Sequence, residues 1–441
     1  MTAQTWLGVS SFLVIVCCSE AFHVGLFVPR STSRPSCIRP HHGLKCTADA
    51  GEISAKVDEL VRVARAKEPP QWFSPSRYED PNGLDMIQRL PLPGFELDSI
   101  GLRGRWETIG DNFVLRPLPG IPVRAVVHFL GGAFVGVAPH FAYRFLLESL
   151  ADEGYVIIAT PYKLTFSYVD LCAEIEARSR VASEALREQY GGVPLVGLGH
   201  SCGALLHVLL SAAFPQDPGP AVNVLISYNN KPAREAIQEY DRVVAPFART
   251  VSERGAVQLT LRGVIETLAD QAEGLAHNIS RTNLAPRFVG AELLPLARQG
   301  LPGVEQVVEL IETIGRGDAA GTPPEFVPSP AETRVLAAGR YRVPRTTLIR
   351  FDDDSLDQTP DLYDALQQRE GADMAGRARV VEMVSLGGTH LTPLSQDMPS
   401  TPLDSFDPLL GLRRAARDAL LAPAQALVRR TLSAFDRGLE V

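Results

Sequence analysis

Residues 193–206 read VPLVGLGHSCGALL, and this stretch determines the fold to which the rest of the chain must conform. An apolar run ends at Gly199, and a small apolar pattern with helical spacing begins after Gly203, which predicts a strand, a sharp turn and a helix. Ser201 stands at the apex of the turn. Its neighbours two residues before and after must lack side chains because the backbones close on one another there. The alternative is an ordinary strand-to-helix turn whose serine only caps the helix.

Strand-like and helical patterns alternate on both sides of this stretch. Strands of this kind pair in parallel through right-handed crossovers, so we expect the α/β class, with a mostly parallel sheet covered by helices on both faces. The predicted strands are residues 125–130 (AVVHFL), 155–159 (YVIIA), 193–198, 223–227, 345–351 and 378–385, with a hairpin at 105–109 and 112–116. The predicted helices include residues 52–66, 141–153, 169–190, 362–370 and 406–439, the last interrupted at Pro423.

The 441 residues are enough for one large domain with an insertion or for two domains. Over residues 232–341 the alternation stops and only helical patterns remain, so we expect a helical lid inserted before the acid-bearing strand. The predicted organisation is a two-part targeting leader (1–48), an N-terminal helix and arm (49–104), a first part of the core (105–231), the lid (232–341), a second part of the core (342–398) and a C-terminal helical segment (399–441).

The leader combines two targeting signals. Residues 6–18 are an apolar run that is too short to span a bilayer and is typical of a signal-peptide core. Residues 21–48 contain arginine, lysine, serine and proline but no acidic residue, which is typical of a transit peptide. The combination predicts the plastid (chloroplast) stroma, and the alternatives are secretion or a membrane anchor. Only Cys172 and Cys202 follow the leader, which favours a reducing compartment.

Composition limits the partners and cofactors. The net charge of -8 argues against nucleic acid, because binding phosphates needs a basic face. The chain has no phosphate-binding glycine loop and no second cluster of oxygen ligands at a metal spacing, so we expect no cofactor and no metal. The basic side of the C-terminal segment could contact a membrane surface, although such helices more often pack on the sheet. Nothing in the sequence indicates a protein partner.

To act as a nucleophile, Ser201 needs a base that takes its proton, and the base needs an anion that holds its tautomer. Three histidines follow Ser201 in the chain. His207 lies on the helix after the turn and points away from the sheet edge, and His277 lies in the lid region. His390 follows the last strand, in a glycine-hinged loop at the edge where the serine turn also ends, and is the candidate base. The alternative is a loop histidine bonded to backbone.

The candidate acid lies in the run Phe351-Asp352-Asp353-Asp354-Ser355 at the end of a predicted strand. The acid of such loops usually lies three residues past the position of Phe351, which selects Asp354. Asp353 is the runner-up, and Asp357 is a more distant third. These carboxylates could instead cap a helix, lie solvated in the loop or bind a cation weakly.

The oxyanion that forms when serine attacks a carbonyl needs two backbone N–H donors. One is expected from Cys202, directly after the serine. The other is expected from the loop after AVVHFL, at Gly131, Gly132 or Ala133.

Other polar residues near these loops have less definite roles. Asn229, Asn230 and Tyr162 are candidates for lining the pocket, although the two asparagines could simply end a strand. His128 is expected to remain in its strand as a core or hydrogen-bonded histidine, and His200 is expected to shape the serine turn rather than transfer protons.

Several long segments resemble the plant, algal and cyanobacterial family known as domain of unknown function 1350, a member of the α/β-hydrolase superfamily. They read HFLGGAFVGVAPHFAYRFLLESLADEGYVIIATPYKLTF, GLGHSCGALLH, ISYNNKPAREAI, LIRFDDDSLDQT and LGGTHLTP, within residues 106–393. The resemblance implies the α/β-hydrolase fold and a plastid setting, and it supports the triad Ser201, Asp354 and His390, but it assigns no substrate. In one departure from lipase-type relatives, the usual His-Gly-Gly loop here begins with Leu130.

The first hypothesis is therefore a serine hydrolase that cleaves an ester or thioester through an acyl-enzyme on Ser201. A helical lid suggests an apolar, lipid-like acyl substrate, and acyl transfer would use the same residues. The second hypothesis is a hydrolase-fold protein with little catalysis that acts as a plastid binding or assembly factor.

Overall fold

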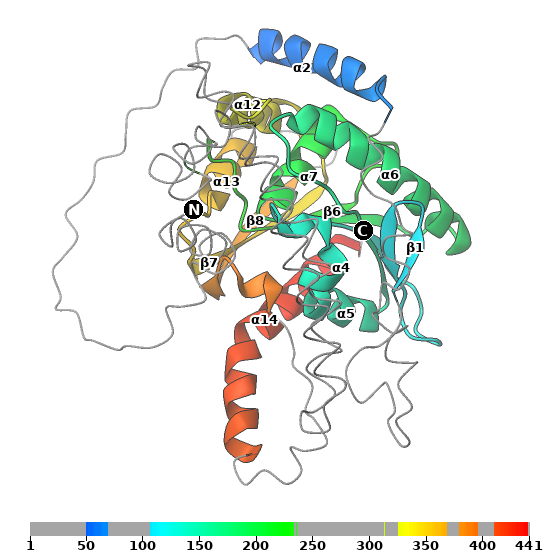
Figure 1. Ribbon diagram of the computed structural model, residues 1–441, viewed down its shortest axis with the longest axis vertical. Coiled ribbons are helices and arrows are strands. Elements are labelled where there is room, and N and C mark those ends of the chain that lie inside the picture. The colour runs from blue at the N-terminus through cyan, green and yellow to red at the C-terminus, as the bar shows by residue number, and fades with distance from the viewer. Residues whose placement is uncertain are drawn as a thin grey trace, which may run out of the picture. The chain divides into compact units, whose positions relative to one another are not determined.

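The structure is a computed structural model, and it describes residues 50–68, 106–232, 325–367, 379–395 and 410–439, together with residues 235 and 313. Figure 1 shows how these parts are arranged. The predicted leader, most of the predicted arm and most of the predicted lid lie outside the described residues, so these predictions remain untested.

The described residues form a sheet of eight strands with the order β1-β2-β4-β3-β5-β6-β7-β8 (Figure 1). Strands β1 and β2 form the predicted hairpin, and β2 pairs antiparallel with β4. All the other neighbouring pairs are parallel, as the alternation of strands and helices predicts. The strands are β1 (Trp106–Ile109), β2 (Asn112–Leu115), β3 (Ala125–Leu130), β4 (Tyr155–Ala159), β5 (Leu195–His200), β6 (Val222–Ile226), β7 (Arg345–Asp353) and β8 (Val380–Thr389).

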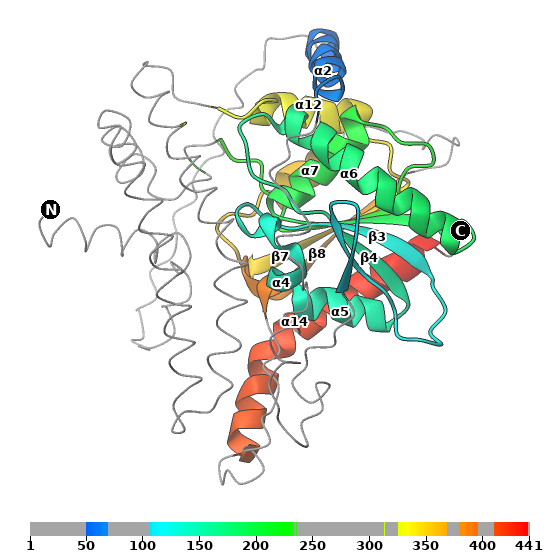
Figure 2. The same cartoon turned by 45° about the vertical axis from the view of Figure 1, so that its right-hand side comes forward.

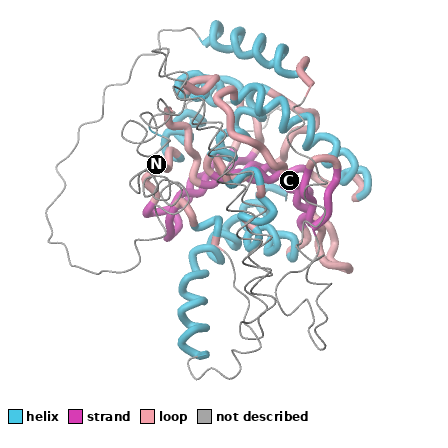
Figure 3. Tube along the Cα trace, in the orientation of Figure 1, coloured by secondary structure: helices cyan, strands magenta, loops and turns pink. Residues whose placement is uncertain are grey.

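Helices cover both faces of the sheet (Figures 2 and 3). The helices α6, α7, α12 and α13 lie on one face, with α2 packed outside α6 and α12, and α5 and α14 lie on the other face. Because both faces are covered, every residue of β3, β4, β5 and β6 is buried. The helices are α2 (Ala50–Arg65), α4 (Pro139–Ala142), α5 (Arg144–Asp152), α6 (Tyr168–Gln189), α7 (Cys202–Ala213), α12 (Pro330–Arg340), α13 (Thr359–Gln367) and α14 (Leu410–Leu439), with 3-10 turns η3 (Val135–Val137) and η5 (Thr392–Leu394).

The helix predicted over residues 141–153 is confirmed as α5 from Arg144 to Asp152, but its expected first residues belong to the separate short helix α4. Tyr143 separates them with φ −113° and ψ 22°. Its ring is fully buried against Phe129, with the ring centroids 4.7 Å apart, and its hydroxyl accepts a hydrogen bond from Gly132 N–H. These contacts hold Tyr143 outside helical geometry.

The last strand and the last helix also differ from the prediction. Strand β8 continues past Ser385 to Thr389, so Gly387 and Gly388 belong to the strand. A register shift between Phe351 and Asp353 of β7 accommodates the two glycines, and Asp353 still pairs with Thr389. Helix α14 is not interrupted at Pro423. Figure 2 shows that α14 changes direction along its length, as a proline inside a helix would cause.

The C-terminal part of α14 packs on the sheet, as basic amphipathic helices more often do. Leu421, Leu427 and Phe435 are buried, and Phe435 lies against Tyr155 of β4 with the ring centroids 5.0 Å apart. Within the described ranges, no helix is both long and apolar enough to cross a membrane.

Three buried polar residues and one glycine form a row across the face of the sheet that α7 covers. His128, Gly197, Asn223 and Thr346 are register partners on four neighbouring strands. His207 of α7 packs beside Gly197, and its Nε2 lies 3.1 Å from the carbonyl oxygen of Leu198. The rings of His128 and His207 meet edge to face, and burial lowers the pKa of both. These two histidines are therefore neutral core residues, and His128 has the role that the sequence predicted.

Candidate active site

The turn between β5 and α7 has the strained geometry that the sequence predicts. Ser201 has φ 54° and ψ −118°, a left-handed conformation that side chains rarely adopt. A Cβ on Gly199 would lie 2.5 Å from the carbonyl oxygen of Gly203, and a Cβ on Gly203 would overlap the carbonyl oxygen of Leu130. The hydrogen bond from Ser201 N–H to Ile226 O, at 2.9 Å, fixes the apex to β6. The two glycines are therefore required by close backbone approach.

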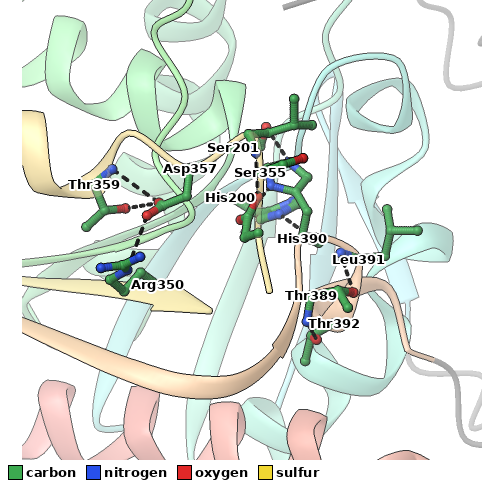
Figure 4. Close-up of polar contacts among 12 residues, drawn as sticks. His200, Ser201, Arg350, Ser355, Asp357, Thr359, Thr389, His390, Leu391 and Thr392 are labelled. Atoms are coloured by element: carbon green, nitrogen blue, oxygen red, sulfur yellow. Dashed lines mark hydrogen bonds and ion pairs between the residues drawn. The ribbon is translucent and has the colours of Figure 1, made fainter. Parts of the chain in front are cut away.

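Three polar side chains meet at the carboxyl edge of the sheet. Ser201 follows β5, Asp354 follows β7 and His390 follows β8. His390 Nε2 lies 3.0 Å from Ser201 Oγ, and His390 Nδ1 lies 2.8 Å from Asp354 Oδ2. Figure 4 shows His390 beside Ser201 and His200. With Nδ1–H donating to the carboxylate, Nε2 can accept the proton of the serine hydroxyl.

The carboxylate of Asp354 is held as an anion. Its side chain is 0% exposed, and burial alone would raise its pKa. The hydrogen bond and charge of His390, the Ser227 hydroxyl and the N–H of Leu356 outweigh burial, so the pKa of Asp354 lies below its ordinary value. The Leu356 N–H donates to Oδ1 at 2.9 Å. Each carboxylate oxygen therefore accepts a hydrogen bond, one from His390 and one from the main chain.

The other two predicted acids have other surroundings, and the acid bonded to the His390 ring is Asp354. Asp353 is exposed and belongs to β7. Asp357 Oδ1 accepts hydrogen bonds from Thr359, at the start of α13. Asp357 Oδ2 lies 3.4 Å from Arg350 Nε (Figure 4). Asp357 therefore supports the beginning of a helix and does not contact the imidazole.

The end of β8 fixes the position of His390. Gly388 has φ 139°, a conformation that favours glycine. The Thr392 hydroxyl accepts a hydrogen bond from Thr389 N–H at 2.9 Å, and the Thr389 hydroxyl accepts one from Leu391 N–H at 3.3 Å (Figure 4). These contacts form a tight turn around His390, which is 7% exposed.

The predicted oxyanion donors differ in whether their main-chain N–H groups already donate a hydrogen bond within the protein. Gly132 N–H donates to Tyr143 Oη at 2.6 Å. Gly131 contributes its carbonyl oxygen to a 2.6 Å hydrogen bond from Tyr162 Oη. Cys202 provides the first N–H of α7, which has no acceptor within its own helix. Among the described residues, none accepts a hydrogen bond from the N–H of Cys202 or Ala133.

The predicted pocket residues have mainly structural contacts. Tyr162 is 1% exposed beneath the loop after β3. Asn230 is buried, and its side-chain amide donates to Pro330 O at 3.0 Å, so it joins the end of β6 to the start of α12. Asn229 is half-buried and accepts a hydrogen bond from Lys231 N–H. Of these three, Asn229 has the most accessible side chain. His277 lies outside the described residues.

Tyr143 is the residue of this region that sequence reasoning missed. It has no motif of its own, because its position depends on the break between α4 and α5. Its hydroxyl lies 2.8 Å from His200 Nδ1, and His200 Nε2 lies 3.0 Å from the main-chain oxygen of His390. His200 therefore shapes more than the serine turn, since it also contacts the turn that carries His390.

Cys202 follows Ser201 in the chain, and its thiol is buried. Burial raises the pKa of Cys202 to about 11, so the thiol is protonated at neutral pH. In the part of the chain that the structure describes, no group of three or more His, Cys, Asp or Glu side chains could hold a metal ion.

The strand order of the sheet, with a strained serine after β5, a buried aspartate after β7 and a histidine after β8, defines this chain as a protein of the α/β-hydrolase fold. The chain belongs to the family described as "Protein of unknown function (DUF1350)", which matches residues 105–267 and 295–436. The family resemblance seen in the sequence is thus confirmed. No curated protein matches the sequence.

Solved structures of several hydrolases are similar to the chain. A thioesterase domain from the curacin biosynthetic pathway is 15% identical over 72% of this chain and 98% of that domain, with a TM-score of 0.33. A structure from work on carboxylesterases of Nitrososphaera gargenis is 15% identical over 70% of this chain and 98% of its own, with a TM-score of 0.33. An enol-lactonase from Burkholderia xenovorans LB400 is 12% identical over 65% of this chain and 93% of its own, with a TM-score of 0.34. These values are low, so the fold is defined by the strand order of the chain itself.

Proposed function

We propose that this protein is a serine hydrolase that cleaves a carboxylic ester or thioester through an acyl-enzyme on Ser201. The observation that supports the proposal is the hydrogen-bonded series from Ser201 to His390 to Asp354, with separations of 3.0 and 2.8 Å. A serine is a weak nucleophile unless a base takes its proton as it attacks, and the base needs a fixed tautomer. Both conditions are met by this arrangement.

The proposed reaction has two halves. Ser201 Oγ bonds to the acyl carbon while its proton passes to His390 Nε2, and His390 then gives that proton to the departing alcohol or thiol as the acyl–oxygen or acyl–sulfur bond breaks. In the second half, His390 takes a proton from water, the hydroxide bonds to the acyl carbon and the proton returns to Ser201 as the acid leaves. Asp354 stabilises the imidazolium in both halves. The N–H groups of Cys202 and Ala133 are the proposed donors to the oxyanion.

Covalent labelling with a fluorophosphonate tests the proposal. The wild-type chain is expected to react, the Ser201→Ala variant is expected not to react, and Ser183→Ala serves as a matched control because Ser183 is a serine on α6. Failure of the folded wild type to react would contradict the proposal and favour a binding or assembly role with little catalysis. A series of p-nitrophenyl esters with lengthening acyl chains would then establish whether apolar acyl groups are preferred.

We also propose that the protein works in the plastid stroma. The composition of residues 1–48 supports this location, and the two cysteines of the described part, Cys172 and Cys202, are both unpaired thiols. A fluorescent protein fused after residue 48 should accumulate in the plastids of an alga with secondary plastids. Accumulation in the medium would favour secretion instead.

A further inference from the structure

His200 lies next to the proposed nucleophile but is not part of the triad, and both nitrogens of its ring have partners. Nε2 lies 3.0 Å from the main-chain oxygen of His390, and Nδ1 lies 2.8 Å from Tyr143 Oη. Tyr143 Oη accepts the N–H of Gly132 at 2.6 Å. His200 is 2% exposed and Tyr143 is 0% exposed, so water does not compete for these bonds.

The positions of the protons in this series follow from its two ends. A main-chain carbonyl oxygen can only accept, so Nε2 of His200 must carry a hydrogen. A neutral imidazole then has a lone pair on Nδ1, which accepts the hydrogen of the Tyr143 hydroxyl. The hydroxyl oxygen keeps a lone pair for the N–H of Gly132. Each donor has one acceptor, and the series is fully satisfied with His200 neutral.

The effect of burial on the pKa values of His200 and Tyr143 is consistent with these proton positions. Desolvation, followed by the charge of His390, holds the pKa of His200 well below its ordinary value. Burial raises the pKa of Tyr143, so the phenol keeps its proton. His200 is thus unsuited to be the base that accepts the proton of serine.

The series joins three segments that are far apart in the sequence. Gly132 belongs to the loop after β3, His200 ends β5 beside Ser201, and His390 follows β8. The rings are also in contact, with centroids 5.7 Å apart for Tyr143 and His200 and 4.9 Å apart for His200 and His390. Three loops of the proposed site therefore share one set of buried contacts.

We propose that Tyr143 and His200 are positioning residues that hold the base loop at His390 and the oxyanion loop at Gly132 in register with Ser201. This inference rests on the proposed hydrolase function. His200 fixes the main chain that carries the base, and Tyr143 fixes the loop that supplies an oxyanion donor. Neither residue touches the reacting atoms, so loss of the bonds displaces the groups that do, and a displacement of about 1 Å can reduce a rate by about 100-fold.

The series has two arms, the bond from His200 to His390 O and the bonds of Tyr143 to His200 and Gly132. Three single substitutions separate these arms, and a fourth is a control. Tyr143→Phe removes only the hydroxyl. His200→Asn keeps an acceptor at the position of Nδ1 and loses the bond to His390 O, whereas His200→Gln keeps a donor at the position of Nε2 and loses the bond to Tyr143. Tyr155→Phe is the matched control, because it removes a tyrosine hydroxyl that donates to Asp436 at 3.0 Å, away from the site.

The measurements are the rate of fluorophosphonate labelling and the kcat and KM of an activated ester. Tyr143→Phe, His200→Asn and His200→Gln should each lower the labelling rate and kcat by about 10-fold to about 100-fold with little change in KM, while Tyr155→Phe should leave both unchanged. Because Tyr143→Phe and His200→Gln break the same arm, the double variant should be no slower than the slower single variant. Independent effects that multiply would contradict the inference.

The result distinguishes this inference from the proposed function. If the wild type is not labelled, the hydrolase proposal fails. If the wild type is labelled and the three variants react at the wild-type rate, the hydrolase proposal stands and the positioning role is refuted.

A measurement on the unaltered protein applies even if a variant fails to fold. In a long-range ¹H–¹⁵N spectrum of the histidine-labelled full chain at neutral pH, His200 should be protonated on Nε2 alone. Protonation on Nδ1, or on both nitrogens, is incompatible with the series and would overturn the inference.

Discussion

The replacement of Asp354 by asparagine, compared with the same replacement of Asp353, tests which carboxylate orients the base. Both carboxylate oxygens are in use, since Oδ2 faces His390 Nδ1 at 2.8 Å and Oδ1 accepts the N–H of Leu356 at 2.9 Å. Asparagine has one oxygen and one NH₂ group, so one of these two donors must face another donor. The main-chain N–H of Leu356 cannot change its role, whereas an imidazole can change its tautomer.

The structure therefore predicts the wrong tautomer in Asp354→Asn. The amide oxygen accepts the hydrogen bond from Leu356 N–H, and the NH₂ group donates to Nδ1 of His390. The imidazole hydrogen then moves to Nε2, and this nitrogen, which faces Ser201, can no longer accept a proton. The side chain of Asp354 is fully buried, so water cannot restore the lost interaction. A loss of this kind lowers kcat by about 10⁴-fold, which corresponds to about 5.4 kcal/mol in the barrier.

The assay is the hydrolysis of an activated p-nitrophenyl ester at neutral pH by Asp354→Asn, Asp353→Asn and the wild type. Asp353 is exposed, so Asp353→Asn should retain the wild-type rate. A wild-type rate for Asp354→Asn, or an equal loss in Asp353→Asn, would refute the assignment of the acid.

Two further predictions concern stability. Gly203→Ala should lower the free energy of unfolding by about 3 kcal/mol, because the added Cβ meets the main chain of Leu130 and Gly131, whereas Gly339→Ala, at an open position of α12, should raise it by about 0.5–1 kcal/mol. Urea unfolding measures both, and equal stability of the two variants would contradict the close packing at the serine turn. The second prediction concerns pH, because burial lowers the pKa of His207 from 6.5 to about 4. Below pH 6.5 the imidazole of His207 binds a proton in the unfolded chain but not in the folded chain. The contribution of His207 to the free energy of unfolding is therefore fully present above pH 6.5 and is lost as the pH falls, by about 2 kcal/mol near pH 5. Urea unfolding at a series of pH values should show this decline and a shallower decline for His207→Gln, and a constant free energy of unfolding over that range would exclude it.

The parts of the fold that depend on local stereochemistry were predictable from the sequence. The glycines at 199 and 203 indicate a turn that brings backbones together, and the structure shows the carbonyl oxygens that a Cβ would meet. The buried strands are continuous apolar runs because both faces of the sheet are covered. The place of Asp354 was also readable, because it is the first residue after β7 at the carboxyl edge of the sheet.

Other features depend on contacts between distant residues and leave no local pattern. The position of Tyr143 follows from a 2.6 Å hydrogen bond to a loop eleven residues earlier and a contact with His200. The length of β8 follows from its pairing with β7, which a bulge extends to Thr389 although Gly387 and Gly388 suggest a loop. Pro423 predicts an end to a helix, but burial of Leu421 and Leu427 on either side stabilises the helix through it.

The central claim is that Ser201 carries the acyl group during turnover. The most direct measurement is the mass of the peptide containing Ser201 after acid quenching of the wild-type protein while it hydrolyses p-nitrophenyl butyrate. A butyryl group is expected on Ser201 and no such group in the Ser201→Ala variant, which should also lose hydrolysis. Steady hydrolysis of the ester by Ser201→Ala, or a butyryl group found only on another residue, would contradict it.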